Sequence, residues 1–191
     1  MKKALFIDRD GTINVDTDYI HKIEDFRFEK NALDGMKLAH EKNYKIIIIT
    51  SQSGIGRGYY TEDDMHRFND HIRDVLSKNG VIIGRKDIYF CPHHPKKATI
   101  AEYLLDCDCR KPKPGLILKA AKEHDINLEE SYMVGDKHSD VAAGVRAGCK
   151  GSILVMCGKS MDTKGEKKEE PTYVAEDLLD AVNFILSNDE K

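Results

Sequence analysis

The stretch LFIDRDGTI, residues 5–13, places two aspartates, Asp8 and Asp10, directly after a short apolar run. Gly11 lets the backbone turn sharply there, and the Thr12 hydroxyl can hydrogen-bond within the turn. Two carboxylates that converge at such a turn can act as a nucleophile and a general acid–base. An acidic loop that merely ends a strand shows the same D-x-D pattern, so the meaning of the pair depends on the rest of the chain.

Four other apolar runs resemble the one before Asp8, namely YKIIIIT (44–50), DIYF (87–90), YMVGD (132–136) and SILVM (152–156). Continuous apolar runs of this length are typical of strands buried on both faces, as in a parallel sheet. The segments between and after them predict helices over residues 31–43, 61–80, 114–125, 138–148 and 176–187. Alternating strands and helices predict an α/β fold, with a central parallel sheet flanked by helices.

The segment 61–80 gives a clear helix signal. Thr61 and Asp64 have the spacing of a capping box at its start, and Gly80 suits its end. We expect the face that packs on the sheet to carry the apolar residues Met65, Phe68, Ile72, Val75 and Leu76.

Length, charge and hydropathy limit the possible classes of protein. A chain of 191 residues suffices for one domain with a sizeable core, so we expect a single domain over residues 1–191. The net charge of -3 gives no overall field that attracts nucleic acid or an anionic membrane. No apolar run approaches the roughly 20 residues of a membrane helix, and the start MKKALFID lacks the pattern of a signal peptide. We therefore expect a cytoplasmic protein. Because nothing in the sequence indicates an exposed apolar patch, we expect a monomer. The polar stretch 158–171 is expected to form a mobile loop.

Three of the five cysteines lie close together in the sequence. Cys91 opens the motif CPHHP, and Cys107 and Cys109 form CDC. An odd number of cysteines in a cytoplasmic chain argues against a disulfide framework. Three thiolates and one imidazole suit a closed tetrahedral zinc site, which would pin the loop rather than catalyse. Either histidine of CPHHP could be the fourth ligand, and Cys149 and Cys157 are expected to be small core residues.

Polar groups that suit a phosphate follow two of the predicted strands. TSQSGIGRG (50–58) offers hydroxyls, loop amides and Arg57, although an ordinary glycine-rich turn is an equally good interpretation of this stretch alone. It is not a dinucleotide-binding fingerprint, because Tyr59 stands where the last glycine would be needed. CRKPKPG (109–115) places Arg110 and Lys111 before a helix, where two cations could neutralise a phosphoryl group.

A further carboxylate follows the strand at 132–136. VGDKHSD (134–140) contains Asp136, with Lys137 and Asp140 behind it. Because the carboxyl ends of parallel strands lie at one edge of a sheet, Asp8 and Asp136 could share a hard cation such as Mg²⁺.

This ordered set of motifs resembles the haloacid-dehalogenase superfamily of phosphatases over residues 4–157. The resemblance implies a Rossmann-like fold and assigns Asp8 as the nucleophile that forms an aspartyl-phosphate. Asp10 would protonate the leaving oxygen and then activate water. Thr50 would hydrogen-bond the phosphoryl group, and Lys111 would stabilise the charge of the nucleophile and the phosphoryl group.

The same resemblance implies a Mg²⁺ site made by the Asp8 side chain, the Asp10 backbone carbonyl and Asp136. Asp140 has two alternative roles, binding the metal through water or orienting Lys111 and its loop. The resemblance leaves open whether Lys137 contributes to the metal site.

The motifs DRDGTIN, SQSGIGRG, CPHHP and CDCRKPKPG more specifically resemble the D-glycero-D-manno-heptose-1,7-bisphosphate 7-phosphatases and the related histidinol-phosphatases. That resemblance implies no large cap domain and a zinc-pinned loop, with Cys91, His93, Cys107 and Cys109 as ligands and His94 as the alternative to His93. It also implies substrate contacts at Asp16, Thr17, Asp18, Tyr19, Ser51, Gln52, Ser53 and Arg110. Two positions depart from the family pattern, which often has glycine at Asp18 and asparagine at Ser51.

The resulting hypothesis is a Mg²⁺-dependent phosphomonoester hydrolase that acts on a small phosphorylated metabolite. Heptose 1,7-bisphosphate is the first candidate substrate, with Arg57 as a candidate contact to its second phosphate, and histidinol phosphate is the alternative. A polynucleotide 3′-phosphatase is a weaker alternative, because the chain is acidic and lacks a basic stripe with interleaved aromatic residues. A non-catalytic zinc-stabilised binding module is disfavoured, since Asp8, Asp10, Lys111 and Asp136 are all present.

Overall fold

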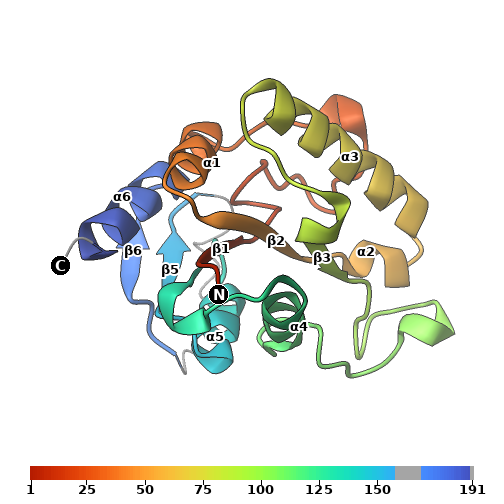
Figure 1. Cartoon of the computed structure of the whole chain (residues 1–191). Helices are drawn as coiled ribbons and strands as arrows, with labels where there is room; N and C mark the ends of the chain where they lie inside the picture. Colours follow the sequence, from red (N-terminus) through yellow and green to blue (C-terminus); the bar gives the residue numbers. More distant parts are fainter. Residues whose placement is uncertain (158–168, 190–191) are drawn as a thin grey trace.

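The computed structural model describes residues 1–157 and 169–189. These residues form a parallel six-stranded sheet with the strand order β3-β2-β1-β4-β5-β6. The strands are β1 (Ala4–Ile7), β2 (Lys45–Ser51), β3 (Ile88–Cys91), β4 (Tyr132–Gly135), β5 (Gly151–Val155) and β6 (Tyr173–Ala175). The helices are α1 (Ala32–Glu41), α2 (Ser53–Gly56), α3 (Glu62–Lys78), α4 (Gly115–His124), α5 (His138–Ala147) and α6 (Leu178–Asp189). The predicted α/β fold is therefore confirmed (Figure 1).

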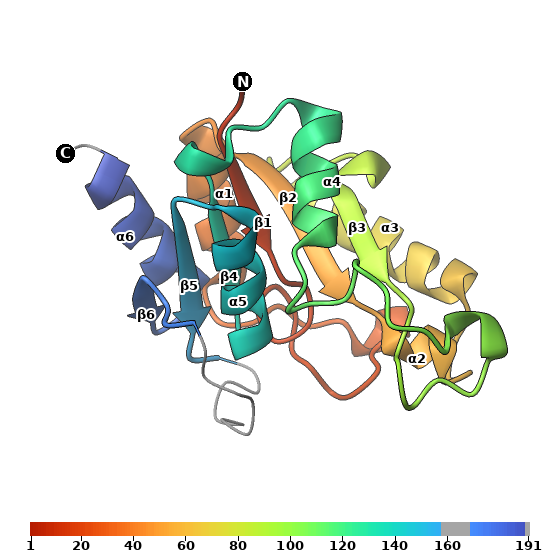
Figure 2. The ribbon, with the colours of Figure 1, turned by 90° about the horizontal axis from the view of Figure 1, so that it is seen from below.

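The sheet lies between two layers of helices, as Figures 1 and 2 show. Helices α1, α3 and α6 pack on one face, where side chains such as Ile48 of β2 and Val134 of β4 are buried. Helices α4 and α5 cover the other face, over Phe6 of β1 and Ile47 of β2. Every residue of β1, β4 and β5 is buried, which explains why their sequences are continuous apolar runs without alternation.

Helix α3 begins as its sequence predicts. The Thr61 hydroxyl accepts from the Asp64 backbone N–H, and the Asp64 carboxylate accepts from the Thr61 N–H, which completes a capping box. The prediction for its buried face needs one correction, because Val75 is only half-buried and the polar Asn69 is buried instead. The Asn69 side chain accepts a hydrogen bond from Arg9, which lies far away in the sequence.

Strand β6 was not predicted, because three residues at the edge of a sheet are too short for a periodic signal. The stretch 158–171 was predicted to be a mobile loop. Its residues 158–168 lie outside the described part of the chain, and this prediction stays untested.

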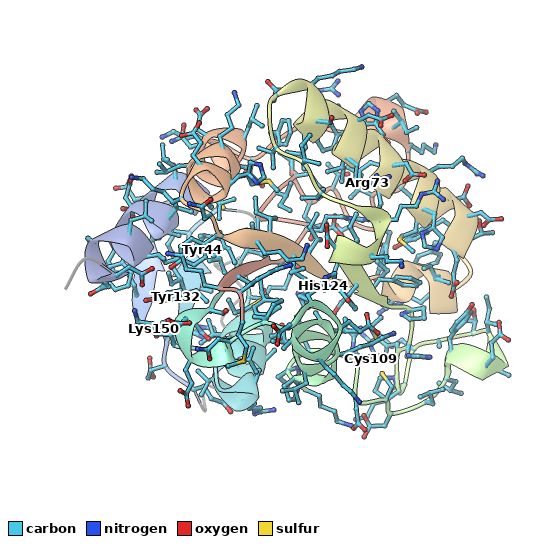
Figure 3. The ribbon with its side chains drawn as sticks, viewed as in Figure 1. Tyr44, Arg73, Cys109, His124, Tyr132 and Lys150 are labelled. Atoms are coloured by element: carbon cyan, nitrogen blue, oxygen red, sulfur yellow. The ribbon has the colours of Figure 1, made fainter. Side chains whose placement is uncertain are left out.

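The amino-terminal edge of the sheet is tied to the last described residue of α6. The Asp189 carboxylate accepts from the Tyr44 hydroxyl, from Lys150 Nζ at 2.8 Å and from Lys3 Nζ at 3.2 Å. Figure 3 labels Tyr44, Tyr132 and Lys150 near one another beside the end of α6. Hydrogen bonds and ion pairs among polar side chains therefore stabilise this edge. The carboxyl ends of the strands lie at the opposite edge.

The connection from β1 to β2 adds no domain over the carboxyl ends of the strands. Residues 8–44, all of which are described, hold a 3-10 turn at Ile23–Asp25 and helix α1, with no separate capping domain. Among the described residues, no helix is both long and apolar enough to span a membrane.

Candidate active site

The loops after β1, β2 and β4 bring the predicted carboxylates and hydroxyl to one place. Asp8 follows β1, and its backbone N–H donates to Val134 O of β4 at 2.9 Å. Thr50 lies near the end of β2 and is fully buried, as is Asp136 directly after β4. Gly11 adopts a φ of +90°, and a Cβ added there would lie 2.4 Å from Asp136 Oδ2. The turn after β1 therefore requires glycine both for its conformation and for the close approach of Asp136.

Lys111 reaches the same place from the loop before α4. Its buried ammonium lies 2.7 Å from Asp8 Oδ1 and 2.5 Å from Asp140 Oδ1, and it donates to Ile49 O at 3.0 Å. Burial by itself would lower the pKa of Lys111, but the charges and hydrogen bonds of Asp140 and Asp8 outweigh it and raise that pKa. Lys111 is therefore a fixed positive charge beside the predicted nucleophile.

Asp140 has two contacts that hold the loop after β4. One of its oxygens pairs with Lys111, and the other accepts from the Lys137 backbone N–H at 2.9 Å at the start of α5. A Cβ at Gly135 would lie 2.4 Å from the Asp140 side chain, so glycine is needed to admit it. Burial raises the pKa of Asp140, against the opposing charge of Lys111. These contacts are those of the orienting alternative for Asp140, and its carboxylate also belongs to the candidate metal group.

Three buried carboxylates gather beside Lys111. Asp8, Asp136 and Asp140 each offer an oxygen, and these oxygens all lie within 4.8 Å of one another. Buried like charges repel strongly unless cations compensate them. A set of carboxylate oxygens with this spacing has the donor chemistry that a hard divalent cation prefers, so the residues fit Mg²⁺.

Asp10 pairs with Arg9 through both of its carboxylate oxygens. Arg9 Nε donates to Asp10 Oδ1 at 2.9 Å, and Arg9 Nη2 donates to Asp10 Oδ2 at 3.0 Å. Arg9 Nη1 donates to the buried Asn69 of α3 at 2.9 Å. Burial would raise the pKa of Asp10, but the Arg9 charge and hydrogen bonds from Arg9, Asn14 and Gln52 outweigh it and lower that pKa. Arg9 is 1% exposed, and the sequence analysis missed it.

A cavity of about 260 Å³ opens onto these groups. Most of the predicted substrate contacts line it, but Thr17 is exposed and outside the lining, and Gln52 is buried behind it. Tyr60 and Ser139 were not predicted to belong to the site, and Lys137 was predicted only as a possible contributor to the metal site. The lining residues are Asp8, Asp10, Asp16, Asp18, Tyr19, Ser51, Ser53, Arg57, Tyr60, Arg110, Lys111, Lys137, Ser139 and Asp140.

Lys137 bridges two acidic groups at the rim of this cavity. Its ammonium lies 3.4 Å from Asp136 Oδ1 and 3.6 Å from Asp16 Oδ2. Burial would lower the pKa of Lys137, but the surrounding carboxylates, Asp8 first, outweigh it and raise that pKa. Lys137 therefore stays charged and offers a second fixed cation near the carboxylates.

The departure at Asp18 has a structural explanation. Asp18 adopts a φ of 64°, in the left-handed region that favours glycine, and its N–H donates to Asp16 Oδ1 at 3.0 Å. Aspartate tolerates this region better than most side chains, so the loop keeps a conformation that suits glycine. The replacement adds a carboxylate to the cavity lining.

The four predicted zinc ligands also meet. Ligand atoms of Cys91, His93, Cys107 and Cys109 all lie within 4.8 Å of one another. His93 Nδ1 is 3.2 Å from Cys109 Sγ, whereas His94 Nδ1 accepts from the backbone N–H groups of the residues at 96 and 97. The geometry therefore places His93, and not His94, among the thiols. Figure 3 labels Cys109 on the side of the molecule that carries α4.

This cluster is linked to the cavity through Arg110. Arg110 directly follows Cys109, and its Nη1 donates to His93 O at 3.2 Å. The next residue is Lys111, whose ammonium pairs with Asp8, so both cations of the loop directly follow the last cysteine of the cluster. The donor set of three thiols and one imidazole fits a structural zinc ion.

Known proteins resemble this chain in sequence and in fold. A family model described as HAD-hydrolase-like matches residues 108–181. The chain is 41% identical over 185 residues to a D-glycero-beta-D-manno-heptose-1,7-bisphosphate 7-phosphatase of Pasteurella multocida (strain Pm70), covering 97% of each chain. It is 46% identical over 156 residues to a D-glycero-alpha-D-manno-heptose-1,7-bisphosphate 7-phosphatase of Photorhabdus laumondii, covering 82% of this chain and 84% of that one.

A solved structure agrees with these matches. It is D,D-heptose 1.7-bisphosphate phosphatase from B. bronchiseptica complexed with magnesium and phosphate, which superposes with a TM-score of 0.83 at 28% identity. The superposition covers 97% of this chain and 99% of that one. Extensive identity over nearly the full length, together with this shared Rossmann-like fold, shows that the chain belongs to the haloacid-dehalogenase-like phosphatases, in the family of the D-glycero-manno-heptose-1,7-bisphosphate 7-phosphatases.

Proposed function

We propose that this phosphatase removes the 7-phosphate of D-glycero-D-manno-heptose 1,7-bisphosphate, with Mg²⁺ as cofactor and an aspartyl-phosphate as intermediate. The observation that carries the proposal is the buried pairing of Asp8 with Lys111, at 2.7 Å, on the floor of a cavity lined by further cations. The names of the curated relatives support the substrate.

In the first step Asp8 attacks the phosphorus. A bond forms between its carboxylate oxygen and phosphorus while the bond from phosphorus to the sugar oxygen breaks. Lys111 and Arg110 offset the negative charge of the phosphoryl oxygens, and the Thr50 hydroxyl donates a hydrogen bond to one of them. In the second step water attacks the phosphorus, which releases inorganic phosphate and regenerates the Asp8 carboxylate.

Asp10 moves the proton in both steps. Its lowered pKa makes it a carboxylate in the resting enzyme, the form that activates water in the second step. The acid form needed for the leaving sugar oxygen arises when the phosphate dianion approaches, because a nearby negative charge raises the pKa of a carboxyl group.

The proposed Mg²⁺ ligands are the Asp8 side chain, the Asp10 backbone carbonyl and Asp136. A Mg²⁺ ion held there would supply positive charge that offsets the negative charges of Asp8 and of the substrate phosphate. Asp140 orients Lys111 and the start of α5, and Lys137 balances the charge of the site at its rim.

The Cys91, His93, Cys107 and Cys109 cluster is proposed to hold a structural Zn²⁺ that fixes the loop carrying Arg110. Asp16, Asp18, Tyr19, Ser51 and Ser53 are proposed to contact the sugar, because they line the cavity. We propose that the chain works as one domain and as a cytoplasmic monomer, with a small phosphorylated metabolite as its partner.

A substrate panel tests the proposal directly. With Mg²⁺ present, we expect kcat/KM for heptose 1,7-bisphosphate to exceed that for histidinol phosphate and for a 3′-phosphorylated oligonucleotide by about 100-fold or more. That ratio corresponds to about 2.7 kcal/mol of transition-state discrimination. Both anomers belong in the panel, because similar relatives are named for each. A preference for histidinol phosphate would replace the substrate, and no phosphate release from any compound would overturn the function.

Replacing Asp10 tests the acid–base role. We expect Asp10→Asn to lower kcat for the sugar phosphate by roughly 10²- to 10⁴-fold, the usual contribution of a positioned acid–base group. The loss should be smaller for an aryl phosphate whose leaving group needs no proton. Exposed Asp34 on α1 gives the matched control Asp34→Asn, which should keep the activity of the unmodified protein. Equal losses for both leaving groups would count against proton donation by Asp10.

A further inference from the structure

Gln52 lies behind the cavity wall rather than in it. It is 1% exposed, and its backbone is fixed because its N–H donates to Cys91 O at 2.8 Å and its carbonyl accepts from the Ile55 N–H at 3.1 Å. The side-chain nitrogen and oxygen of Gln52 already have protein partners, so its amide is engaged by the protein rather than offered to a substrate in the cavity. We therefore look for a role of Gln52 other than the predicted contact with the substrate.

The Gln52 amide joins two catalytic groups. Its Nε2 lies 2.8 Å from Asp10 Oδ2 and 2.7 Å from Thr50 Oγ1, so both amide hydrogens have an acceptor. A carboxylate only accepts hydrogen bonds, so the atom beside Asp10 has to be the nitrogen. The amide cannot rotate by half a turn without placing its oxygen against that carboxylate.

Tyr60 fixes the other end of the amide. Its hydroxyl donates to Gln52 Oε1 at 2.6 Å. Burial raises the pKa of Tyr60, so this hydroxyl keeps its proton and remains a donor. The two contacts select the same amide orientation from opposite ends.

The orientation of the Gln52 amide limits the direction in which the Thr50 hydroxyl can donate its hydrogen bond. The Thr50 oxygen already accepts from Gln52, and a hydroxyl has one hydrogen to donate. That hydrogen is therefore not donated to Gln52, and in the proposed function a phosphoryl oxygen accepts it, while the same amide holds the Asp10 carboxylate.

We infer that Gln52, with Tyr60 behind it, is a positioning residue that sets the hydroxyl direction of Thr50 and the orientation of Asp10. The inference rests on the proposed function, because it assumes that Thr50 and Asp10 act on the phosphoryl group. It differs from the direct-contact prediction in its kinetic signature. A positioning residue affects kcat, whereas a group that binds substrate equally in the ground and transition states affects KM.

The test compares two replacements of Gln52 with one of Tyr60, using the holoenzyme with Mg²⁺ and the sugar phosphate. Gln52→Glu has the same shape but places a second carboxylate oxygen against Asp10, and Gln52→Met removes the hydrogen bonds. We expect kcat to fall about 100-fold in both with KM within about threefold. Tyr60→Phe removes the hydrogen bond to Gln52 Oε1 and loosens that end of the amide, so it should lower kcat by about 3- to 10-fold.

Ser131 provides the matched control for loss of a buried polar group. Its hydroxyl accepts from Ala4 N–H at 2.9 Å and donates to Asn127 O at 2.6 Å, at the opposite edge of the sheet. Ser131→Ala should lower the melting temperature and leave kcat and KM unchanged.

Energetic coupling between Gln52 and Thr50 gives a second readout. Adding Gln52→Met to Thr50→Val should cost far less than the product of the two single losses, since each removes the same donated hydrogen bond. A kcat within threefold of the unmodified protein in Gln52→Met, or a raised KM with unchanged kcat, would overturn the inference. If a Gln52 variant does not fold, unchanged kcat in Tyr60→Phe does the same. Absence of turnover by the unmodified protein would instead overturn the proposed function.

Discussion

Asp8→Asn is expected to lower kcat by roughly 10⁴-fold or more, because the neutral amide cannot attack phosphorus as a carboxylate does. The replacement keeps the shape of the side chain, so the cavity and the Lys111 position should be preserved. Lys111 still pairs with Asp140 at 2.5 Å and donates to Ile49 O at 3.0 Å. Steady-state phosphate release and single-turnover kinetics measure the loss.

The same variant should not destabilise the metal-free fold. Asp8, Asp136 and Asp140 are three buried carboxylates whose oxygens lie within 4.8 Å of one another, so removing one charge relieves repulsion. We expect the melting temperature without Mg²⁺ to stay the same or rise, and its increase on adding Mg²⁺ to shrink. Exposed Asp74 on α3 supplies the control Asp74→Asn. Turnover at the normal rate in Asp8→Asn would eliminate the aspartyl-phosphate mechanism.

The convergence of Asp8, Thr50 and Asp136 could be predicted from the sequence, because parallel strands all end at one edge of the sheet. Each of these residues follows or ends an apolar run, and such runs identify buried strands without knowledge of their order. The fold class was predictable for the same reason. The edge strand β6 was not, since it is too short to leave a pattern.

Contacts between distant polar residues could not be predicted in the same way. Arg9 is buried because Asn69 of α3 and Asp10 satisfy its guanidinium, and Asn69 is 60 residues away in the chain. Asn69 in turn occupies a buried helix position that its polarity alone would assign to the surface. The contacts of Gln52 were unpredictable for the same reason. Its position close to Thr50 in the sequence suggests a shared role, but the sequence does not show which atoms its amide contacts.

Cys107→Ser is expected to release zinc and to lower the stability of the fold. Because zinc-binding free energy is folding free energy, loss of one ligand should cost roughly 3 kcal/mol, a drop of about 6–12 °C in Tm for a chain of this size. Cys107 Sγ lies 3.5 Å from Cys91 Sγ and 3.0 Å from Cys109 Sγ. Metal content by mass spectrometry and thermal unfolding measure both effects. Half-buried Cys149, outside the cluster, gives the control Cys149→Ser, which should keep its zinc.

Replacing each of the two adjacent histidines in turn separates the effect of losing a zinc ligand from the effect of changing the loop. His93→Asn should lose zinc and stability as Cys107→Ser does. His94→Asn should retain both, because the His94 ring accepts from loop N–H groups and lies outside the group of metal-ligating atoms. Both zinc-deficient variants should also lower kcat/KM about 10-fold or more, since Arg110 is held through His93 O at 3.2 Å and precedes Lys111. Full stability and no bound metal in the unmodified protein would remove the structural zinc. Normal kcat/KM in a folded, zinc-free His93→Asn would show that Lys111 is held by Asp8 and Asp140 alone.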